Sequence, residues 1–366
     1  LTQGSVVPKL ERSVADYCQA KYGVAVNSAT SALHIACLAL DVGVGDIVWT
    51  SATTFVASSN CALYCGAEID FIDIDSQTFN INIFALKQKL AQAKKNNKLP
   101  TVVIAVHMCG QPCNMKEISN LSKEYGFRII EDAAHAIGSE YKGQKTGACQ
   151  FSDITVFSFH PVKIITTAEG GMALTNSKEL AKKMSLLRSH GITRDESEMI
   201  NEPTGGWYYE QIDLGFNYRM TELQAALGVS QMDRINEFVS KRHLLAKNYE
   251  KLLKNLPIDL PTLKDDCYSS FHLYVIRLKL SQIKLTHKEI FSKLRDTRIG
   301  VNLHYMPVYL QPYYQQNSIS KGRFKQGYCK EAEAYARNAI SIPLYPFLTT
   351  ADQQRIADEL EKILCQ

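Results

Sequence analysis

The sequence has no apolar run close to the roughly 20 residues that a membrane-spanning helix needs, and stretches such as HIACLALDVGVGD are soon interrupted by charge. It has no internal repeat and no low-complexity segment, and proline and glycine are modest at 11 and 20 of 366 residues. These absences exclude collagen-like and disordered chains. We expect a folded protein that does not span a membrane and is long enough for about two domains.

An excess of charge of one sign is also lacking. The chain carries 41 Lys and Arg against 37 Asp and Glu, a net charge of +4, and the basic residues form no block. Nucleic acids and acidic membrane surfaces attract clustered basic charge, so neither is an expected partner. The first predicted strand is not followed by the GxGxxG pattern of nicotinamide-dependent dehydrogenases. We expect a small-molecule enzyme of another kind.

The ten cysteines include no CxxC pair, which argues against a structural zinc site. Cys61 with Cys65 and Cys109 with Cys113 are closer pairs, but neither has a matching pair of His or Asp residues. We expect no metal, and we interpret the cysteines as reduced thiols of a cytoplasmic protein. The chain opens at Leu1 without an initiator Met or an export signal, and we expect that an N-terminal piece is missing.

Short apolar segments alternate with helical patterns through the first two thirds of the chain. Examples are GVAVNS before TSALHIACLAL and TVVIAVHM before MKEISNLSKEYG. Continuous apolar strands between helices predict an α/β fold with a mostly parallel sheet covered on both faces. Ligands bind beyond the carboxyl ends of such strands. The polar residues expected to converge there are Asn27, Ser28, Thr54, His107, Asp132, His135, Ser158 and His160.

A long amphipathic stretch at 221–255 breaks this rhythm, and we interpret it as one connecting helix. Beyond it we expect a strand, a helix, another strand and two helices, the last opened by a capping box of Thr350 and Gln353. The pattern predicts a large domain at residues 1–235 and a smaller C-terminal α/β domain at residues 236–366.

Lys163 is the first residue that suggests chemistry. It follows a strand that ends at Ser158, within the apolar, β-branched and glycine-flanked segment PVKIITTAEGG. Burial disfavours the ammonium form, and a neutral lysine amine can attack a carbonyl carbon, of which pyridoxal phosphate (PLP) is the obvious example. The alternative is a lysine whose stem covers apolar surface while its amine reaches water.

Asp132 follows the buried run FRII at a strand's carboxyl end, where a cationic partner would offset the cost of burying a carboxylate. A PLP enzyme needs a carboxylate against the pyridine nitrogen, because the protonated ring then accepts electrons. Alternatively, Asp132 caps the next helix. His135 is suited to bond the ring hydroxyl of the cofactor, or it is a satisfied core histidine.

The segment NSATSALHIACLAL offers small residues at a helix N-terminus, where backbone N–H groups bind phosphate. Ser158 can add its hydroxyl. The same pattern is also that of an ordinary helix cap. Phe55, after the strand DIVWTSATT, suits stacking on the pyridine face, and core packing explains it equally well.

Several segments together resemble one known family. They are NSATSALHIA, TTFVASSN, HMCGQP, IIEDAAHAIGS, FSFHPVKIITTAEGGMALTN, LRSHGITRD and LGFNYRMTELQAALG. With them, the chain is similar nearly end to end to the DegT/DnrJ/EryC1/StrS sugar-nucleotide aminotransferases. The resemblance implies fold type I of the PLP-dependent transferases, the aspartate-aminotransferase-like fold, and a homodimer whose two sites lie at the subunit interface.

The resemblance also implies roles for single residues. Lys163 binds the cofactor covalently and carries the proton, Asp132 faces the pyridine nitrogen, and His135 lies beside the ring hydroxyl. The implied contacts to the ring face and to phosphate are Phe55, Thr30, Ser31, Ser158 and, reaching the cofactor of the partner subunit, Asn217. The implied substrate positions are Arg219, His304 and Tyr305. His160 is expected only to shape the turn.

LTQG at the start and TTAEGG after the lysine favour one branch of the family. The implied reaction is amination of C4 of a UDP-linked 4-keto-6-deoxy-N-acetylhexosamine by glutamate, in pseudaminic acid biosynthesis. Another nucleotide-linked 3- or 4-keto sugar is the alternative. Cys109 stands where an aromatic residue is common in HxxGQP, a departure that concerns the sugar pocket rather than the cofactor.

Two alternative functions differ from transamination in their chemistry. A sugar dehydratase of the same family has histidine in place of the lysine, whereas Lys163 is present, and the scattered cysteines match no iron–sulfur cluster spacing. The other rival is a non-enzymatic nucleotide-sugar-binding protein on the same fold. The joint presence of Lys163, Asp132 and Asn217 argues against it.

Overall fold

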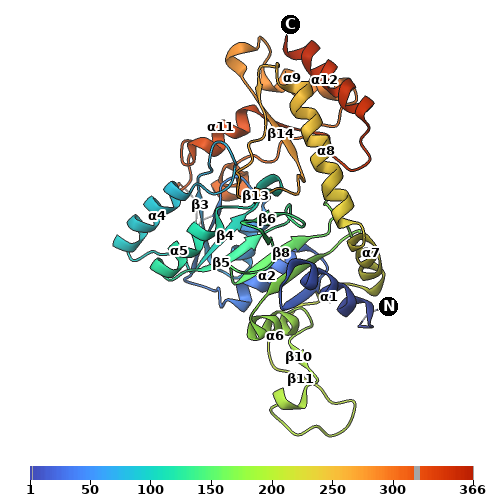
Figure 1. Cartoon of the computed structure of the whole chain (residues 1–366). Helices are drawn as coiled ribbons and strands as arrows, with labels where there is room; N and C mark the ends of the chain where they lie inside the picture. The colour runs from blue at the N-terminus through green and yellow to red at the C-terminus, as the bar shows by residue number, and fades with distance from the viewer. Residues whose placement is uncertain (2, 317–321, 366) are drawn as a thin grey trace.

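A seven-stranded sheet lies at the centre of the computed structural model, which describes residues 1, 3–316 and 322–365 (Figure 1). In spatial order its strands are β1 (Tyr22–Val26), β9 (Gly171–Thr175), β8 (Ile154–Ser158), β5 (Arg128–Asp132), β4 (Val102–Val106), β2 (Ile47–Ser51) and β3 (Glu68–Ile72). Paired strands are parallel except at β9, which is antiparallel to both its neighbours. The predicted mostly parallel sheet is confirmed.

Helices cover both faces of this sheet. One face packs against α2 (Ala29–Ala39), α3 (Ala57–Tyr64) and α6 (Lys178–Leu187). The other packs against α4 (Ile83–Lys95), α5 (Met115–Tyr125), α1 (Val6–Cys18) and α7 (Glu222–Met232). In β4, Val102 and Ile104 join the core on the first face and Val103 and Ala105 the core on the second. Burial on both faces is why these strands are apolar throughout instead of alternating.

The stretch at 221–255 is two helices, so the prediction of one connecting helix is wrong. After α7 the chain turns at Arg234, whose φ of −112° and ψ of 2° are not helical, and α8 (Ile235–Leu253) follows. Ala225 of α7 packs in the core beside α1, whereas Tyr249 of α8 packs in the C-terminal core. Because of this turn, the apolar face of α7 packs in the core beside α1 and the apolar face of α8 packs in the C-terminal core.

The chain after α8 builds a three-stranded sheet of β12 (Ile258–Asp259), β14 (Tyr274–Leu278) and β15 (Ala339–Ile342). Its helices are α9 (His287–Asp296), α10 (Pro312–Gln316), α11 (Lys330–Asn338) and α12 (Thr350–Leu364). A further strand, β13 (Cys267–Tyr268), returns to pair with the hairpin of β6 (Glu140–Tyr141) and β7 (Gln144–Lys145). The domain boundary between residues 235 and 236 stays a prediction.

The capping box of the last helix is shifted by one residue from the predicted pair Thr350 and Gln353. The Thr349 hydroxyl accepts the N–H of Asp352 at 3.1 Å, and the Asp352 carboxylate accepts the N–H of Thr349 at 3.0 Å. Thr350 therefore already lies in the first turn of α12, because an aspartate at the third position closes the box as a glutamine would.

A hairpin-like segment between α6 and α7 projects from the body of the molecule (Figure 1). It contains β10 (Ile192–Thr193) paired with β11 (Glu210–Gln211). Several large apolar side chains on it face solvent, with Ile200 84%, Trp207 75% and Leu214 76% exposed. Large exposed apolar side chains of this kind are a feature of interaction surfaces when they lie together.

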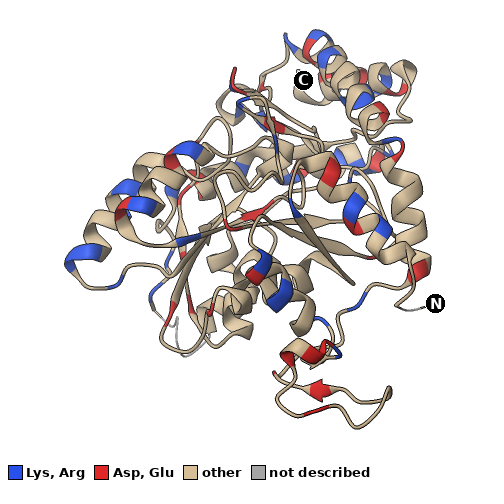
Figure 2. Ribbon diagram, turned by 60° about the horizontal axis from the view of Figure 1, so that its bottom comes forward, with Lys and Arg blue, Asp and Glu red and all other residues tan. Residues whose placement is uncertain are grey.

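Charged residues lie mainly on the outer helices and loops, with acidic and basic side chains interspersed (Figure 2). Within the large sheet only β3 and β5 contain charged residues, and those at the carboxyl end of β5 are Glu131 and Asp132. No helix among the described residues is both long enough and apolar enough to cross a bilayer.

Candidate active site

A cavity of about 510 Å³ opens at the carboxyl edge of the large sheet. Its walls come from the N-terminus of α2, the loop after β2, the ends of β5 and β8, the β8–β9 loop, and residues 302–305 of the C-terminal part. Parallel strands bring their carboxyl ends to one edge, which is why distant segments meet there. The predicted site residues that line it are Thr30, Phe55, Asp132, His135, Ser158, Lys163, His304 and Tyr305. Ser28, Thr54 and His160, also expected at this edge, line it too.

Lys163 lies half-buried in the loop between β8 and β9, where its backbone N–H donates to the carbonyl of His160 at 2.9 Å. Burial lowers the pKa of the Lys163 amine to about 8, and the negative charge of Asp132 partly opposes this shift. A substantial fraction of the amine is therefore neutral near pH 7 to 8, which is the form that attacks a carbonyl.

This pKa can be measured in the cofactor-free protein. We expect acylation of Lys163 by an amine-directed reagent to reach half its limiting rate near pH 8, because only the neutral amine above that pH is nucleophilic. Lys178, which is exposed and lies outside this cavity, serves as the matched control, and its labelling curve should differ from that of Lys163. Peptide mass spectrometry over a pH series gives both curves. Coincident curves would contradict the assignment.

Asp132, at the end of β5, is 5% exposed and each of its carboxylate oxygens has a partner. Oδ1 accepts the N–H of Ala134 at 3.1 Å, and Oδ2 accepts the hydroxyl of Ser58 at 2.6 Å. The first bond is a local turn cap, although turns and not a helix follow. The carboxylate thus stabilises the turn and also borders the cavity.

His135 is buried and lacks one of its hydrogen bonds. Its Nε2 lies 3.4 Å from the hydroxyl of Tyr305, while Nδ1 has no partner among the described residues. Burial lowers the pKa of His135 well below its usual value, and the charges of Lys163 and His304 add to the effect. A neutral imidazole with an unpaired buried nitrogen is costly unless a ligand completes it.

The N-terminus of α2 forms the far end of the cavity. Ser28 caps this helix by accepting the N–H of Ser31 at 3.1 Å, and Thr30 lines the cavity beside it. A Cβ at Gly171 would lie 2.5 Å from the backbone nitrogen of Ala29, so only glycine lets β9 come this close to the helix. Unpaired N–H groups at such a terminus suit a phosphate.

The residues expected at this edge or in this site that do not line the cavity are Asn27, Ser31, His107, Asn217 and Arg219. His107 is buried, and its Nε2 lies 2.6 Å from the carboxylate of Glu131. Ser31 is buried, and its hydroxyl donates to Asn27 at 2.7 Å. Asn217 is exposed in the segment that returns from the projecting hairpin. Arg219 lines a separate cavity of about 250 Å³ beside Arg188. Ser31 still lies beside the cavity, because its hydroxyl is 3.0 Å from that of Ser28, whereas Asn217 and Arg219 do not line the cavity of their own chain.

Four further side chains belong to the site or its surroundings without having been predicted. Glu169 and Asn302 line the cavity, Ser58 bonds Asp132, and the ring of His272 lies 4.4 Å from that of His135. Ser58 carries a weak sequence signal because it lies one helical turn after Thr54. His272 carries none, because its loop is distant in the chain from His135.

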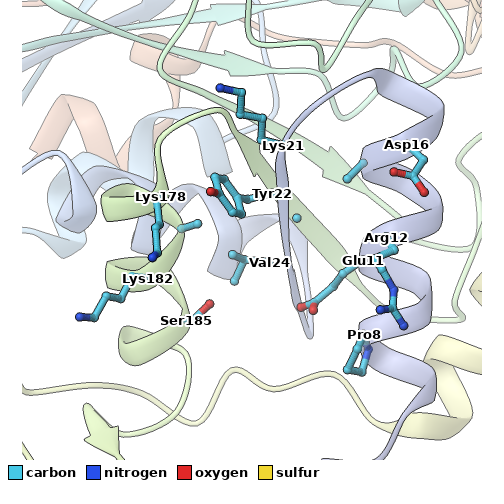
Figure 3. Close-up of a pocket in the computed structure, with 13 residues that line it drawn as sticks. Pro8, Glu11, Arg12, Asp16, Lys21, Tyr22, Val24, Lys178, Lys182 and Ser185 are labelled. Carbon is cyan, nitrogen blue, oxygen red and sulfur yellow. The ribbon is translucent and has the colours of Figure 1, made fainter. Parts of the chain in front are cut away.

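A second cavity of about 360 Å³ lies between α1 and α6 (Figure 3). Lys178 and Lys182 of α6 border it on one side, and Glu11 and Arg12 of α1 on the other. None of the predicted site residues lines this second cavity, so the cavity around Lys163 is the candidate active site.

A sequence model described as the DegT/DnrJ/EryC1/StrS aminotransferase family matches residues 1–361. The chain belongs to this family. It is 37% identical over 365 residues to the UDP-4-amino-4,6-dideoxy-N-acetyl-beta-L-altrosamine transaminase of Campylobacter jejuni strain 81-176, covering 100% of this chain and 91% of that protein.

Solved structures of other aminotransferases have the same fold as this chain. Helicobacter pylori PseC, an aminotransferase involved in the biosynthesis of pseudoaminic acid, is similar with a TM-score of 0.89 and 31% identity, covering 100% of this chain and 92% of that chain. Spr1654 of Streptococcus pneumoniae in its PLP form is similar with a TM-score of 0.86 and 28% identity, covering 100% of this chain and 93% of that chain.

The protein is therefore a PLP-dependent sugar aminotransferase, and the predicted family, fold class, enzyme class and cofactor are confirmed. The cavity residues fit PLP in their chemistry. A lysine with a lowered pKa, a buried carboxylate, an unpaired nitrogen on His135 and a helix N-terminus border one space. These groups match the aldehyde, pyridine nitrogen, ring hydroxyl and phosphate of the cofactor.

Proposed function

We propose that this enzyme transfers the amino group of glutamate to C4 of a UDP-linked 4-keto-6-deoxy-N-acetylhexosamine. The product is UDP-4-amino-4,6-dideoxy-N-acetyl-β-L-altrosamine, for pseudaminic acid biosynthesis. The observation that carries the proposal is the shared cavity of Lys163 and Asp132 in a chain 37% identical to a transaminase of that name.

PLP supplies an aldehyde that binds amines covalently and a ring that takes up electrons released at the neighbouring carbon. In our proposal Lys163 holds the cofactor, and its Nζ, once free, removes the proton from Cα of glutamate. The lowered pKa of Lys163 suits this task, because a general base must be neutral at the working pH. For the keto-sugar, Nζ delivers the proton to C4 in the reverse direction.

The neighbours of Lys163 fix the cofactor in this proposal. Asp132 stabilises positive charge at the pyridine nitrogen, and His135 bonds the ring hydroxyl. Phe55 is 57% exposed at the cavity wall, which leaves its face available for stacking on the pyridine. Thr30 and Ser158 hold the phosphate with the N-terminus of α2, whereas Ser31 supports this end from behind through its bond to Asn27.

We propose a cytoplasmic homodimer whose two sites each use both subunits. The exposed Ile200, Trp207 and Leu214 of the projecting hairpin support this, because burial against a second copy removes apolar surface from water. Asn217 lies on the return of that hairpin, outside its own cavity, so the partner subunit's Asn217 is the one proposed to reach the phosphate. The remaining substrate positions in the proposal are Arg219, His304 and Tyr305.

Incubation with glutamate and a set of UDP- and dTDP-linked keto-sugars tests the substrate. We expect the yellow holoenzyme to bleach with glutamate, to regain its colour with the UDP-4-keto sugar, and to yield an amine at C4 by NMR. Turnover of dTDP-3-keto sugars alone would contradict the substrate while leaving the enzyme class intact. Bleaching by glutamate without recovery on any keto-sugar would also contradict it.

A further inference from the structure

The carboxylate of Asp132 receives one side-chain hydrogen bond from the residues that the structure describes. The donor is Ser58, at 2.6 Å from Oδ2, and the Ser58 side chain is completely buried. Ser58 lies in the first turn of α3, after β2, whereas Asp132 ends β5. Since β4 separates these two strands, the contact spans the end of an intervening strand.

The Ser58 hydroxyl has a second partner, Thr54, which itself lines the cavity. The hydroxyl of Thr54 lies 2.7 Å from that of Ser58, and both residues are buried. An ionised carboxylate only accepts, so Ser58 donates its single proton to Asp132 and must accept from Thr54. The direction of both bonds is therefore fixed by the charge on Asp132, and the pair forms a donor chain that stabilises that charge.

The same short segment also carries Phe55, which lies between Thr54 and Ser58 in the sequence and lines the cavity wall. The backbone N–H of Ser58 donates to the carbonyl of Phe55 at 3.2 Å. Residues 54–58 thus connect Phe55 at the cavity wall with the hydroxyl that binds the Asp132 carboxylate. Loss of either hydroxyl is therefore expected to change the position of the Asp132 carboxylate relative to Phe55.

We propose that Ser58 is a positioning residue, which with Thr54 behind it fixes the Asp132 carboxylate for its charge–charge contact with the cofactor ring. The inference rests on the proposed function, in which Asp132 faces the pyridine nitrogen. Ser58 acts only through Asp132, because it does not line the cavity. Its role is to hold the carboxylate in one orientation.

The test is Ser58→Ala in the holoenzyme, read from the pH midpoint of the visible absorption band and from the cofactor Kd. A loosely held carboxylate stabilises positive charge on the ring less well. The proton shared by Lys163 and the cofactor is then retained to higher pH. We expect the midpoint to rise by about 0.5 to 1 unit and kcat/KM to fall about tenfold, the size of one bond to a charged group.

Ser59→Ala is the matched control. Ser59 is equally buried in the same helix, but its hydroxyl bonds the carbonyl of Val56 and the hydroxyl of Tyr314 rather than Asp132. The control is expected to leave the spectral midpoint unchanged. Equal shifts in the two variants, or none in Ser58→Ala, would overturn the proposal, because packing alone would then explain the serine.

Thr54→Val removes the second link at nearly constant volume and keeps the test valid if Ser58→Ala does not fold. We expect a smaller shift in the same direction, and the double variant should shift no further than Ser58→Ala. Absence of any shift in Thr54→Val, or additive shifts, would contradict a donor chain. If Asp132→Asn also leaves the midpoint unchanged, the role of Asp132 fails. If only Asp132→Asn moves it, the positioning inference alone fails.

Discussion

Lys163→Ala is expected to reduce transamination by about 10⁴-fold, the largest effect of any single substitution, because it removes the proposed proton carrier. The cofactor should still bind through the helix N-terminus, Asp132 and Phe55, but without a covalent bond to the protein. Single-turnover assays with glutamate measure the rate. Borohydride reduction followed by mass spectrometry measures the covalent bond.

Lys178→Ala controls for the loss of a lysine next to a cavity. Lys178 lines the second cavity (Figure 3) and is exposed, so its removal should leave both readouts unchanged. Addition of a small primary amine should restore part of the Lys163→Ala rate, since the amine supplies a base in the vacated space. Turnover near that of the wild type without added amine would refute the role of Lys163.

Asp132→Asn is expected to lower kcat by about 10³-fold, because it removes the charge that we propose stabilises the electron-accepting ring while keeping the size of the side chain. The cofactor Kd should rise as well. The amide oxygen that the substitution introduces can still accept the bond from Ser58, which makes this change milder for the fold than alanine. Steady-state kinetics and a cofactor titration give the two values.

Asp153→Asn is a control for loss of a carboxylate near the same strand. Asp153 pairs with Arg128 at 2.8 Å and accepts the N–H of Ile129, at the opposite end of β5 from Asp132. Its replacement should affect stability more than kcat. A loss of kcat in Asp153→Asn as large as in Asp132→Asn would show that general damage to β5, not the charge beside the ring, causes the effect.

The sequence predicted the parts of the fold that depend on local patterns. The apolar strands were recognisable because helices cover the sheet on both faces, and Lys163 and Asp132 were recognisable because charged residues rarely follow such runs. The bend at Arg234 was not, because neither glycine nor proline marks it and the amphipathic pattern continues across it. The capping box was missed by one residue because adjacent threonines, at 349 and 350, both suit the cap.

Contacts between distant segments were the part that the sequence could not provide. Ser58 meets Asp132 across the end of β4, which lies between their strands, and no local sequence pattern specifies that strand order. Ser31 was grouped with Thr30 on composition, but neighbouring helix positions point in different directions, and its hydroxyl turns to Asn27. The roles of Asn217 and Arg219, which do not line the cavity of their own chain, stay predictions.

The wall formed by Asn302–Tyr305 is the last wall of the cavity to be synthesised on the ribosome. All other walls of the cavity are encoded before residue 171, yet this one emerges only after α8 and most of the C-terminal sheet have been synthesised. A chain that stops at α8 lacks this wall of the cavity. The residues that complete the cavity wall are therefore synthesised late in translation, well after Lys163.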